Sequence, residues 1–211
     1  MNRNPANEKT LDAGSAKPDR EMREAILMTA VRLFRDVGYH KTTVADIAKA
    51  MRMSPANIYR FFDSKKAIHE SAARFLMGEV ETAAKTIANG NEPATERLRT
   101  LLATVHHMNA ARYVEDSKIH EMVVVAMEES WDVCEAHILQ ITLCMAQVIA
   151  DGAAAGLFHV ADVEVSSKCA SAAMLRFFHP QMIAQFNHKP SATLNDMIAF
   201  VIAGLTARPS E

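Results

Sequence analysis

Residues 43–62 read TVADIAKAMRMSPANIYRFF and contain two helix starts separated by a short turn. At the first start, Thr43 supplies an N-cap hydroxyl and Asp46 supplies a carboxylate at N3, which is the arrangement of a capping box. At the second start, Ser54 can cap the helix and Pro55 stands at N1, where its missing N–H costs nothing and its fixed φ suits the first turn. The stretch therefore predicts two short helices in a helix-turn-helix arrangement.

The flanking residues predict that these two helices belong to a three-helix unit within residues 20–62. Upstream, apolar residues recur on one helix face, and Gly38 stands where a left-handed residue ends a helix. The upstream apolar face consists of Ile26, Ala30, Leu33 and Phe34. Downstream, Asp63-Ser64-Lys65 marks a further break and start, from which a long helix can run to Asn89-Gly90.

The third helix of this unit is short and polar on one face, as a helix must be to enter a major groove about 12 Å wide. The residues expected to point outward from it are Pro55, Ala56, Asn57, Tyr59 and Arg60. Asn contacts adenine, Arg reads guanine or a phosphate, and Ala or Pro touches a thymine methyl. Lys65 is expected beside Tyr59 at the next helix N-terminus, where both would hold backbone phosphates.

The remaining chain predicts helices only, so the fold class is all-α. Apolar residues at helical spacing define five further helices, over residues 92–112, 118–128, 131–155, 162–178 and 192–205. With 7 Gly and 7 Pro in 211 residues, the chain has few turn signals, which argues against a β-sandwich. We expect residues 1–18 to form a flexible arm.

Charge and composition narrow the class of protein. Residues 1–77 carry fourteen Lys/Arg and nine Asp/Glu, a balance of +5, whereas residues 78–211 carry a balance of −7. A basic segment on an acidic body is typical of a nucleic-acid reader attached to another domain. No apolar run approaches the roughly 20 residues that span a bilayer, and residues 1–18 lack an apolar core of secretory length. Three unclustered cysteines fit a reducing compartment, so we expect a cytoplasmic protein.

Two stretches, LFRDVGYHKTTVADIA at residues 33–48 and SPANIYRFFDSKKAI at residues 54–68, resemble the TetR/AcrR family of transcriptional regulators. The resemblance covers about fifty residues with nearly every signature position filled. It departs from the family in the turn, where Ala50-Met51-Arg52-Met53-Ser54 replaces the usual Ala-Gly-Val-Ser. The missing glycine predicts either an altered angle between the two helices or an added phosphate contact from Arg52.

The resemblance implies a homodimeric repressor whose two subunits read the halves of a palindromic operator and are released by a small molecule. It divides the chain into a flexible arm at 1–18, a helix-turn-helix DNA-binding domain at 19–66, and an effector-binding and dimerisation domain at 67–211. The predicted DNA-contacting residues are Thr43, Arg52, Pro55, Ala56, Asn57, Tyr59, Arg60 and Lys65. No cofactor is implied.

The effector pocket is expected between the helices at 92–112, 118–128 and 131–155. Small-molecule sites are mostly apolar with a few polar anchors, and His106 is the candidate anchor. The expected lining is Leu102, Val105, His106, Met122, Trp131, Ile138, Ile141 and Met145. Met adapts to varied apolar ligands, although plain core filling explains any single Met as well. Trp131 would close the pocket mouth or simply staple the start of its helix.

Two apolar helices, at 162–178 and 192–205, predict a four-helix interface between two copies of the chain. The small residues expected to permit close approach there are Ala170, Ala172, Ala173 and Gly204.

Two other functions remain open at this point. One is a helical metal-dependent enzyme using His106, His120 and Glu121; the other is an architectural DNA-binding protein without an effector. Against a metal or an enzyme, the chain has no H-E-x-x-H or C-x-x-C spacing, no G-x-S-x-G and no Gly-rich phosphate loop. We therefore expect no metal site and no catalysis.

Overall fold

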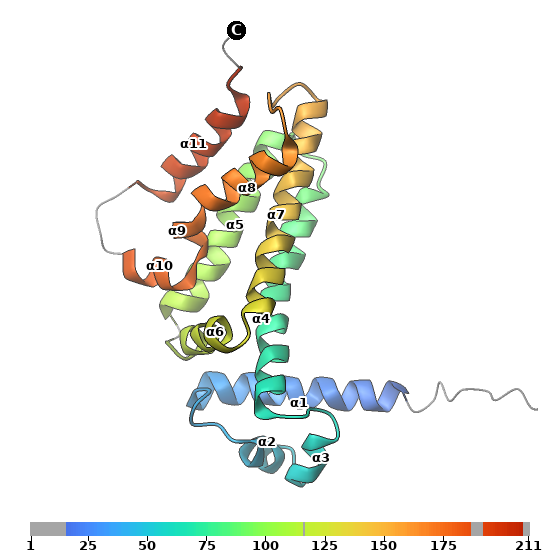
Figure 1. Ribbon diagram of the computed structural model, residues 1–211. Coiled ribbons are helices and arrows are strands. Elements are labelled where there is room, and N and C mark those ends of the chain that lie inside the picture. The colour runs from blue at the N-terminus through green and yellow to red at the C-terminus, as the bar shows by residue number, and fades with distance from the viewer. Residues whose placement is uncertain (1–15, 116, 187–191, 209–211) are drawn as a thin grey trace, which may run out of the picture.

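The computed structural model describes residues 16–115, 117–186 and 192–208, and within these ranges it contains helices and no strand (Figure 1). The predicted all-α class is confirmed. Eleven helices are present in the described residues: α1 (Ala16–Val37), α2 (Val44–Ala50), α3 (Pro55–Tyr59), α4 (Lys65–Ala88), α5 (Ala94–Glu115), α6 (Ser117–Glu129), α7 (Trp131–Ala154), α8 (Val163–Ala173), α9 (Leu175–Phe178), α10 (Pro180–Phe186) and α11 (Leu194–Thr206).

Helices α1, α2 and α3 form one unit, which we call the head. Its core is a continuous cluster that also includes the first turns of α4: Ile26, Ala30, Val31, Phe34, Tyr39, Val44, Ile47, Ala48, Ile58, Phe62, Ile68, Ala72 and Leu76, with Met122 and Val125 of α6. Gly38 ends α1 at a φ of +100°, the left-handed conformation that its position predicted. Of the predicted flexible arm, residues 16–18 belong to α1, and the rest lies outside the described residues.

Helices α5 to α11 form the body, and α4 runs from the head into it (Figure 1). Helices α4, α5, α7 and α8 pack against one another around a second core that includes Leu98, Leu101, Leu102, Met145, Val148 and Ile149. Of the described helices, only α7 is long and apolar enough to cross a membrane, judged by length and composition alone. The sequence pattern does not predict this, because the uninterrupted apolar runs within α7 are short. Helix α7 packs against α4, α5 and α8 with part of its surface, and Ile138, Leu139 and Leu143 of the same helix remain exposed in the single chain.

The predicted helix at 162–178 is wrong in one respect, because it breaks at Met174 into α8 and α9. Met174 ends α8 and begins α9, and its carbonyl accepts from the N–H of Phe177 at 2.8 Å. The side chains of Met174 and Phe177 are both buried, so the apolar pattern continues through the break. Hydrophobic periodicity therefore cannot detect it. His179 then takes an extended backbone, as a residue before proline does, and Pro180 begins α10.

Candidate DNA-binding surface and effector cavity

The predicted caps position α2 and α3. The N–H of Asp46 donates to Thr43 Oγ1 at 3.2 Å, and the N–H of Thr43 donates to Asp46 Oδ2 at 2.9 Å, which completes the capping box. The hydroxyl of Thr43 also donates to Asp46 Oδ2 at 2.7 Å, and this bond, together with the one from the Thr43 N–H, holds the pKa of Asp46 below its usual value. At α3 the N–H of Asn57 donates to Ser54 Oγ at 3.3 Å, and Pro55 is the first helical residue. Both helix starts follow from local sequence.

Arg52 forms the turn between α2 and α3 in a left-handed conformation, with φ +56°. The N–H of Met53 donates to the carbonyl of Ala48 at 2.9 Å, and the N–H of Arg52 donates to the carbonyl of Lys49 at 3.1 Å. This pair of bonds is a Schellman motif, in which glycine is the usual left-handed residue. Arg52 therefore adopts the backbone conformation that a glycine would supply, and its side chain is exposed.

The short helix α3 presents its polar side to solvent. Ile58 is its buried residue and holds it against the head core, while the predicted outward residues are all exposed: Pro55, Ala56, Asn57, Tyr59 and Arg60. The structure thus brings the predicted base-reading residues together on one free surface, next to the exposed side chains of Thr43 and Arg52 at the ends of α2.

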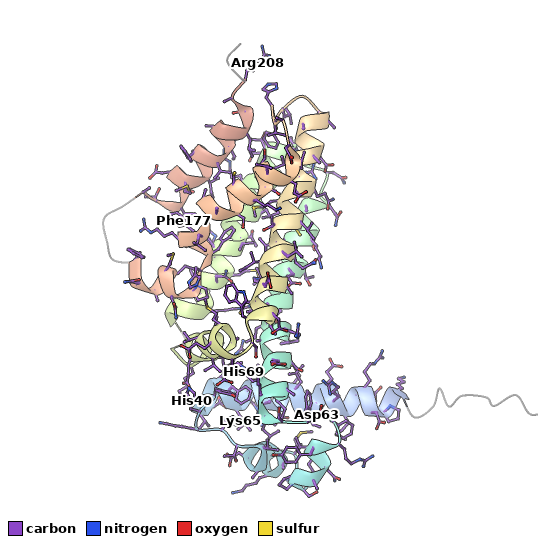
Figure 2. The ribbon with its side chains drawn as sticks, in the orientation of Figure 1. His40, Asp63, Lys65, His69, Phe177 and Arg208 are labelled. Carbon is purple, nitrogen blue, oxygen red and sulfur yellow. The ribbon has the colours of Figure 1, made fainter. Side chains whose placement is uncertain are left out.

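Lys65 lies at the N-terminus of α4 as expected, but its neighbour differs from the expected Tyr59. Its Nζ lies 4.1 Å from the centroid of the Tyr39 ring, in a cation–π contact. The side chain is partly buried, and burial lowers the pKa of Lys65. Figure 2 shows Lys65 near His40 and His69, where the head meets the body.

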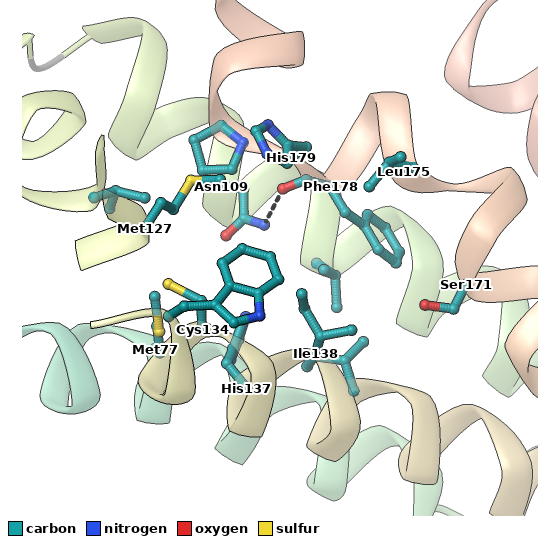
Figure 3. Close-up of a pocket in the computed structure, with 15 residues that line it drawn as sticks. Met77, Asn109, Met127, Cys134, His137, Ile138, Ser171, Leu175, Phe178 and His179 are labelled. Atoms are coloured by element: carbon teal, nitrogen blue, oxygen red, sulfur yellow. Dashed lines mark hydrogen bonds between the residues drawn. The ribbon is translucent and has the colours of Figure 1, made fainter. Parts of the chain in front are cut away.

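A cavity of about 110 Å³ lies in the body, with walls from every helix between α4 and α10 (Figure 3). Its lining residues are Met77, Val105, Asn109, Val123, Met127, Trp131, Cys134, His137, Ile138, Ile141, Ser171, Leu175, Phe178, His179 and Pro180. Trp131 is 51% exposed at the start of α7, so it stands at the edge of the cavity. A single water needs only about 10–15 Å³, so the cavity has room for a small molecule.

Four of the eight predicted lining residues lie on this cavity: Val105, Trp131, Ile138 and Ile141. The other four do not, which corrects the expectation. Leu102 and Met145 are fully buried in the body core, and Met122 is buried in the head core. His106 Nδ1 is hydrogen-bonded to the carbonyl of Phe177 at 2.8 Å, so its role as anchor is also withdrawn. Helical spacing separates buried from exposed faces but does not show which buried positions border a cavity.

Three polar groups of the cavity wall already have partners. Asn109 Nδ2 donates to the carbonyl of Phe178 at 3.0 Å, the bond drawn in Figure 3. His137 Nδ1 lies 3.0 Å from Glu81 Oε1, and Ser171 Oγ accepts from Thr142 Oγ1 at 3.2 Å. Burial nevertheless lowers the pKa of His137, against the opposing effect of Glu81. The sequence indicated none of these as ligand-contacting residues.

His179 differs from these three groups. Its Nδ1 is buried and has no hydrogen-bond partner among the residues that the structure describes. Burial lowers the pKa of this imidazole, so it is neutral near pH 7. The only sequence signal for its placement is the following Pro180, which forces the extended backbone at this corner.

Helix α6 joins the cavity to the head. Val123 and Met127 line the cavity, while the carbonyl of the neighbouring Met122 lies 2.9 Å from Nε2 of the buried His69 on α4. Glu121 Oε1 accepts from the backbone N–H of His40 at 3.1 Å, in the segment that links α1 to α2. One short helix therefore contacts both the cavity and the head.

No group of three or more His, Cys, Asp or Glu side chains that could hold a metal occurs in the described part of the chain. Glu121 and His106, two members of the expected enzyme triad, have different partners: the N–H of His40 and the carbonyl of Phe177. The side chain of His120 lies outside the described residues.

These features are those of a helix-turn-helix regulator whose body contains a cavity. Residues 26–72 match the family described as bacterial regulatory proteins, tetR family, and residues 94–198 match the tetracyclin repressor-like C-terminal domain. The chain belongs to the TetR family of transcriptional regulators. The family and fold point to a DNA-binding transcriptional regulator, and TetR regulators bind small molecules and form dimers.

Individual curated relatives match only part of the chain. IcaR of Staphylococcus aureus strain Newman, a negative transcriptional regulator of a biofilm operon, is 42% identical over 53 residues, 25% of this chain and 28% of IcaR. YuxN of Bacillus subtilis strain 168 is 32% identical over 77 residues, 36% of this chain and 26% of YuxN. The chain thus matches less than a third of the length of these curated relatives.

Solved structures share the whole fold at low identity. RolR bound to resorcinol has a TM-score of 0.61 at 14% identity, covering 90% of both chains. Thermus thermophilus FadR with lauroyl-CoA has a TM-score of 0.60 at 17% identity, covering 89% and 97%. A regulator from Saccharomonospora viridis with choline has a TM-score of 0.60 at 22% identity, covering 86% and 94%. These likenesses concern the fold alone.

Proposed function

We propose that the chain is a homodimeric repressor that binds a palindromic operator through α3 and is released by a small effector in the body cavity. The observation that carries the proposal is α6, which lines the cavity with Val123 and Met127 and holds the head through Met122 and Glu121. A ligand that displaces α6 would therefore move the head. The printed role of IcaR, a negative regulator, supports repression. A DNA target places the protein in the cytoplasm.

The proposed DNA contacts divide by chemistry. Asn57 and Arg60 would reach base edges, and Pro55 and Ala56 would touch thymine methyl groups, because all four are exposed on α3. Thr43, Arg52, Tyr59 and Lys65 would hold backbone phosphates. Lys65 would do so from the α4 N-terminus while its ammonium rests on Tyr39.

The proposed dimer face lies on α8 and α11. Val165 on α8 is 55% exposed and Phe200 on α11 is 71% exposed. Exposed apolar side chains of this size are typical of a surface that a partner covers. Ala172 of α8 is also exposed. On α11, a Cβ added at Gly204 would meet open space. Ala170 instead packs in the chain's own core, so it is dropped from the expected interface. Two copies would bury these faces isologously.

The cavity favours a compact, uncharged effector. No Lys, Arg, Asp or Glu is among its lining residues. A cation such as the choline bound by the S. viridis protein, or an anion such as the lauroyl-CoA bound by FadR, would lose hydration without gaining a counter-charge. At about 110 Å³ the cavity is also too small for an acyl chain of that length. The resorcinol of RolR is the printed ligand nearest in size and charge.

The test measures binding of the full chain to the DNA upstream of its own gene by fluorescence anisotropy. We expect saturable binding that protects an inverted repeat and that weakens when a pool of small neutral aromatics is added. Binding that no compound in the pool changes would favour the architectural alternative. Binding that responds only to a chelator or an added metal would favour a metal-dependent protein.

A further inference from the structure

Among the amide, hydroxyl and imidazole groups of the cavity wall, the imidazole of His179 is the one without a partner in the described residues. Asn109, His137 and Ser171 are occupied by Phe178, Glu81 and Thr142. The imidazole of His179 makes no hydrogen bond to any described residue, and its Nδ1 is buried. Buried polar nitrogens in folded proteins are nearly always paired, so an orphan on a cavity wall indicates a partner that arrives with a ligand.

The backbone that carries this imidazole is held on both sides. His179 lies between α9 and α10 with an extended backbone (φ −77°, ψ 122°), and the ring of Pro180 immediately follows and also lines the cavity. Its N–H donates to the carbonyl of Leu175 at 2.8 Å, and its carbonyl accepts from the N–H of Ile183 at 2.9 Å. A neutral imidazole held in this way offers one acceptor and one donor nitrogen, which match a hydroxyl group.

The rest of the wall sets the size and charge of the partner. The lining has no charged side chain, and the nearest carboxylate, Glu81, already binds His137. Aromatic and aliphatic groups, including Trp131 and Phe178, supply the remaining surface. An apolar cavity of about 150 Å³ accommodates benzene, so the smaller volume of about 110 Å³ limits the partner to a single ring, part of which lies at the open edge beside the half-exposed Trp131.

We propose that the cavity binds a neutral, single-ring aromatic that carries a hydroxyl, and that His179 hydrogen-bonds this hydroxyl. The inference rests on the proposed function, because it names the chemical class of the effector for the same cavity. It replaces His106, which is occupied by Phe177, with His179 as the polar anchor.

Four probes of similar size test the proposal: phenol, toluene, benzoate and benzylammonium. Trp131 is the single tryptophan of the chain and lines the cavity, so its fluorescence reports occupancy directly. Excitation at the red edge of the indole absorption avoids the probes. We expect phenol to bind roughly three- to tenfold more tightly than toluene, the ratio that one neutral hydrogen bond supplies, and the two ions to bind more weakly than either.

Substitution assigns the hydrogen bond. His179→Phe keeps a ring on the wall and should bring phenol and toluene within about twofold of each other, chiefly by weakening phenol. His106→Asn is the matched control: it changes a histidine outside the cavity lining, keeps an amide near the Nδ1 position, and should preserve the preference for phenol. Circular dichroism and thermal melting without ligand establish that each variant folds.

Three outcomes overturn the inference. They are equal affinities for phenol and toluene in the wild-type chain, a phenol preference that survives His179→Phe, and tightest binding by benzoate or benzylammonium. In each of these the cavity still binds a small molecule, so a repressor released by an effector in this cavity stands, although tightest binding by an ion would contradict the uncharged effector argued for it. If none of the four probes changes Trp131 fluorescence, the inference also fails, and the DNA-release assay with the wider pool judges the proposed function separately.

Discussion

At the scale of single residues, the backbone conformation of Arg52 lowers the stability of the head. An L-residue in the left-handed region is roughly 1–2 kcal/mol less stable than in the right-handed one, and glycine avoids that cost. With φ +56° and an exposed side chain, Arg52 has no packing role that offsets it. A phosphate contact would give the arginine a function at this strained position.

Two substitutions at Arg52 separate strain from charge. Arg52→Gly should stabilise the head by up to about 1 kcal/mol and also weaken binding to all DNA sequences, with a log–log salt slope lower by about one. Arg52→Ala should weaken binding equally but give no gain in stability, because alanine keeps the strain. Urea unfolding and anisotropy over a salt series measure both effects. Unchanged DNA affinity in both variants would remove Arg52 from the contact surface.

Asn57 and Lys65 should differ in the kind of contact they lose. Asn57 is exposed on α3, so Asn57→Ala should relax preference at specific operator positions, at a cost of about 1–3 kcal/mol for the preferred base. Lys65 carries its charge at the α4 N-terminus, so Lys65→Ala should weaken operator and scrambled DNA alike and lower the salt slope by about one. Binding of each variant to both DNAs across a salt series tests this. A changed base preference in Lys65→Ala with an intact salt slope would show that α3 is oriented differently.

At the scale of helices, two glycines in long helices lie in opposite surroundings. In α7, a Cβ on Gly152 would lie 2.2 Å from Cδ2 of the buried Phe158, whereas a Cβ on Gly78 in α4 would meet nothing within 4 Å. Gly152→Ala should therefore destabilise the body by about 1–3 kcal/mol through overpacking. Gly78→Ala should stabilise the chain by about 0.5–1 kcal/mol, because alanine favours helix. Denaturant unfolding of the two variants should give changes of opposite sign, and equal signs would contradict the packing.

The junction of α4 and α6 makes stability depend on pH. His69 is 0% exposed, its Nδ1 has no partner within the described residues, and burial lowers its pKa. Because the unfolded histidine binds a proton at about pH 6.5 and the folded one does so only at lower pH, this contribution to stability is complete above pH 6.5 and is lost as the pH falls. Lys65 nearby opposes protonation further, although Glu129 and Glu70 favour it.

Unfolding measured between pH 7.5 and 5 should show this loss, with His106, His137 and His179 adding to it in the same direction. His69→Phe keeps the ring contacts with Phe34 and Tyr39, so the chain should still fold. Its slope of stability against pH should be shallower by up to about 1.4 kcal/mol per pH unit. A slope equal to that of the wild type would mean that His69 binds its proton equally in the folded and unfolded chain, so that folding does not lower its pKa.

Local signals determine how much of this architecture the sequence predicts. The caps at Thr43 and Ser54 act within one turn of chain, so the starts of α2 and α3 were predictable to the residue. The same signal, Thr193 with Asp196, marks the start of α11, two residues beyond the predicted one. The break at Met174 and the choice of Val105 over Leu102 as cavity wall depend on how distant helices pack, and no local pattern encodes that.

At the scale of the whole molecule, the head and the cavity belong to separate cores that meet along α4 and α6. Met122 and Val125 complete the head core, while Val123 of the same helix lines the cavity. Successive residues of α6 thus face different cores, and a small shift of the helix must disturb both. This arrangement accounts for coupling within one chain, but reading a palindrome also requires a second copy at a fixed spacing.

The requirement for a second copy makes the exposed face of α11 a place to test the dimer. Phe200 is the most exposed large apolar residue of the described chain and lies on α11, away from the head (Figure 1). Phe200→Glu should produce a monomer at micromolar concentration, because an isologous interface would bury the new charge twice, once on each copy, against an apolar face. Since Phe200 makes no core contact, the unfolding midpoint of the monomer should fall only by the lost stabilisation from dimer formation. Operator affinity should fall by about a hundredfold or more, because each head then binds its half-site independently.

Sedimentation and anisotropy measure these two changes in the Phe200→Glu variant. The control is Met28→Glu, at a 44% exposed site on α1, and this variant should remain dimeric. If Phe200→Glu sediments as a dimer, the interface lies elsewhere on the body.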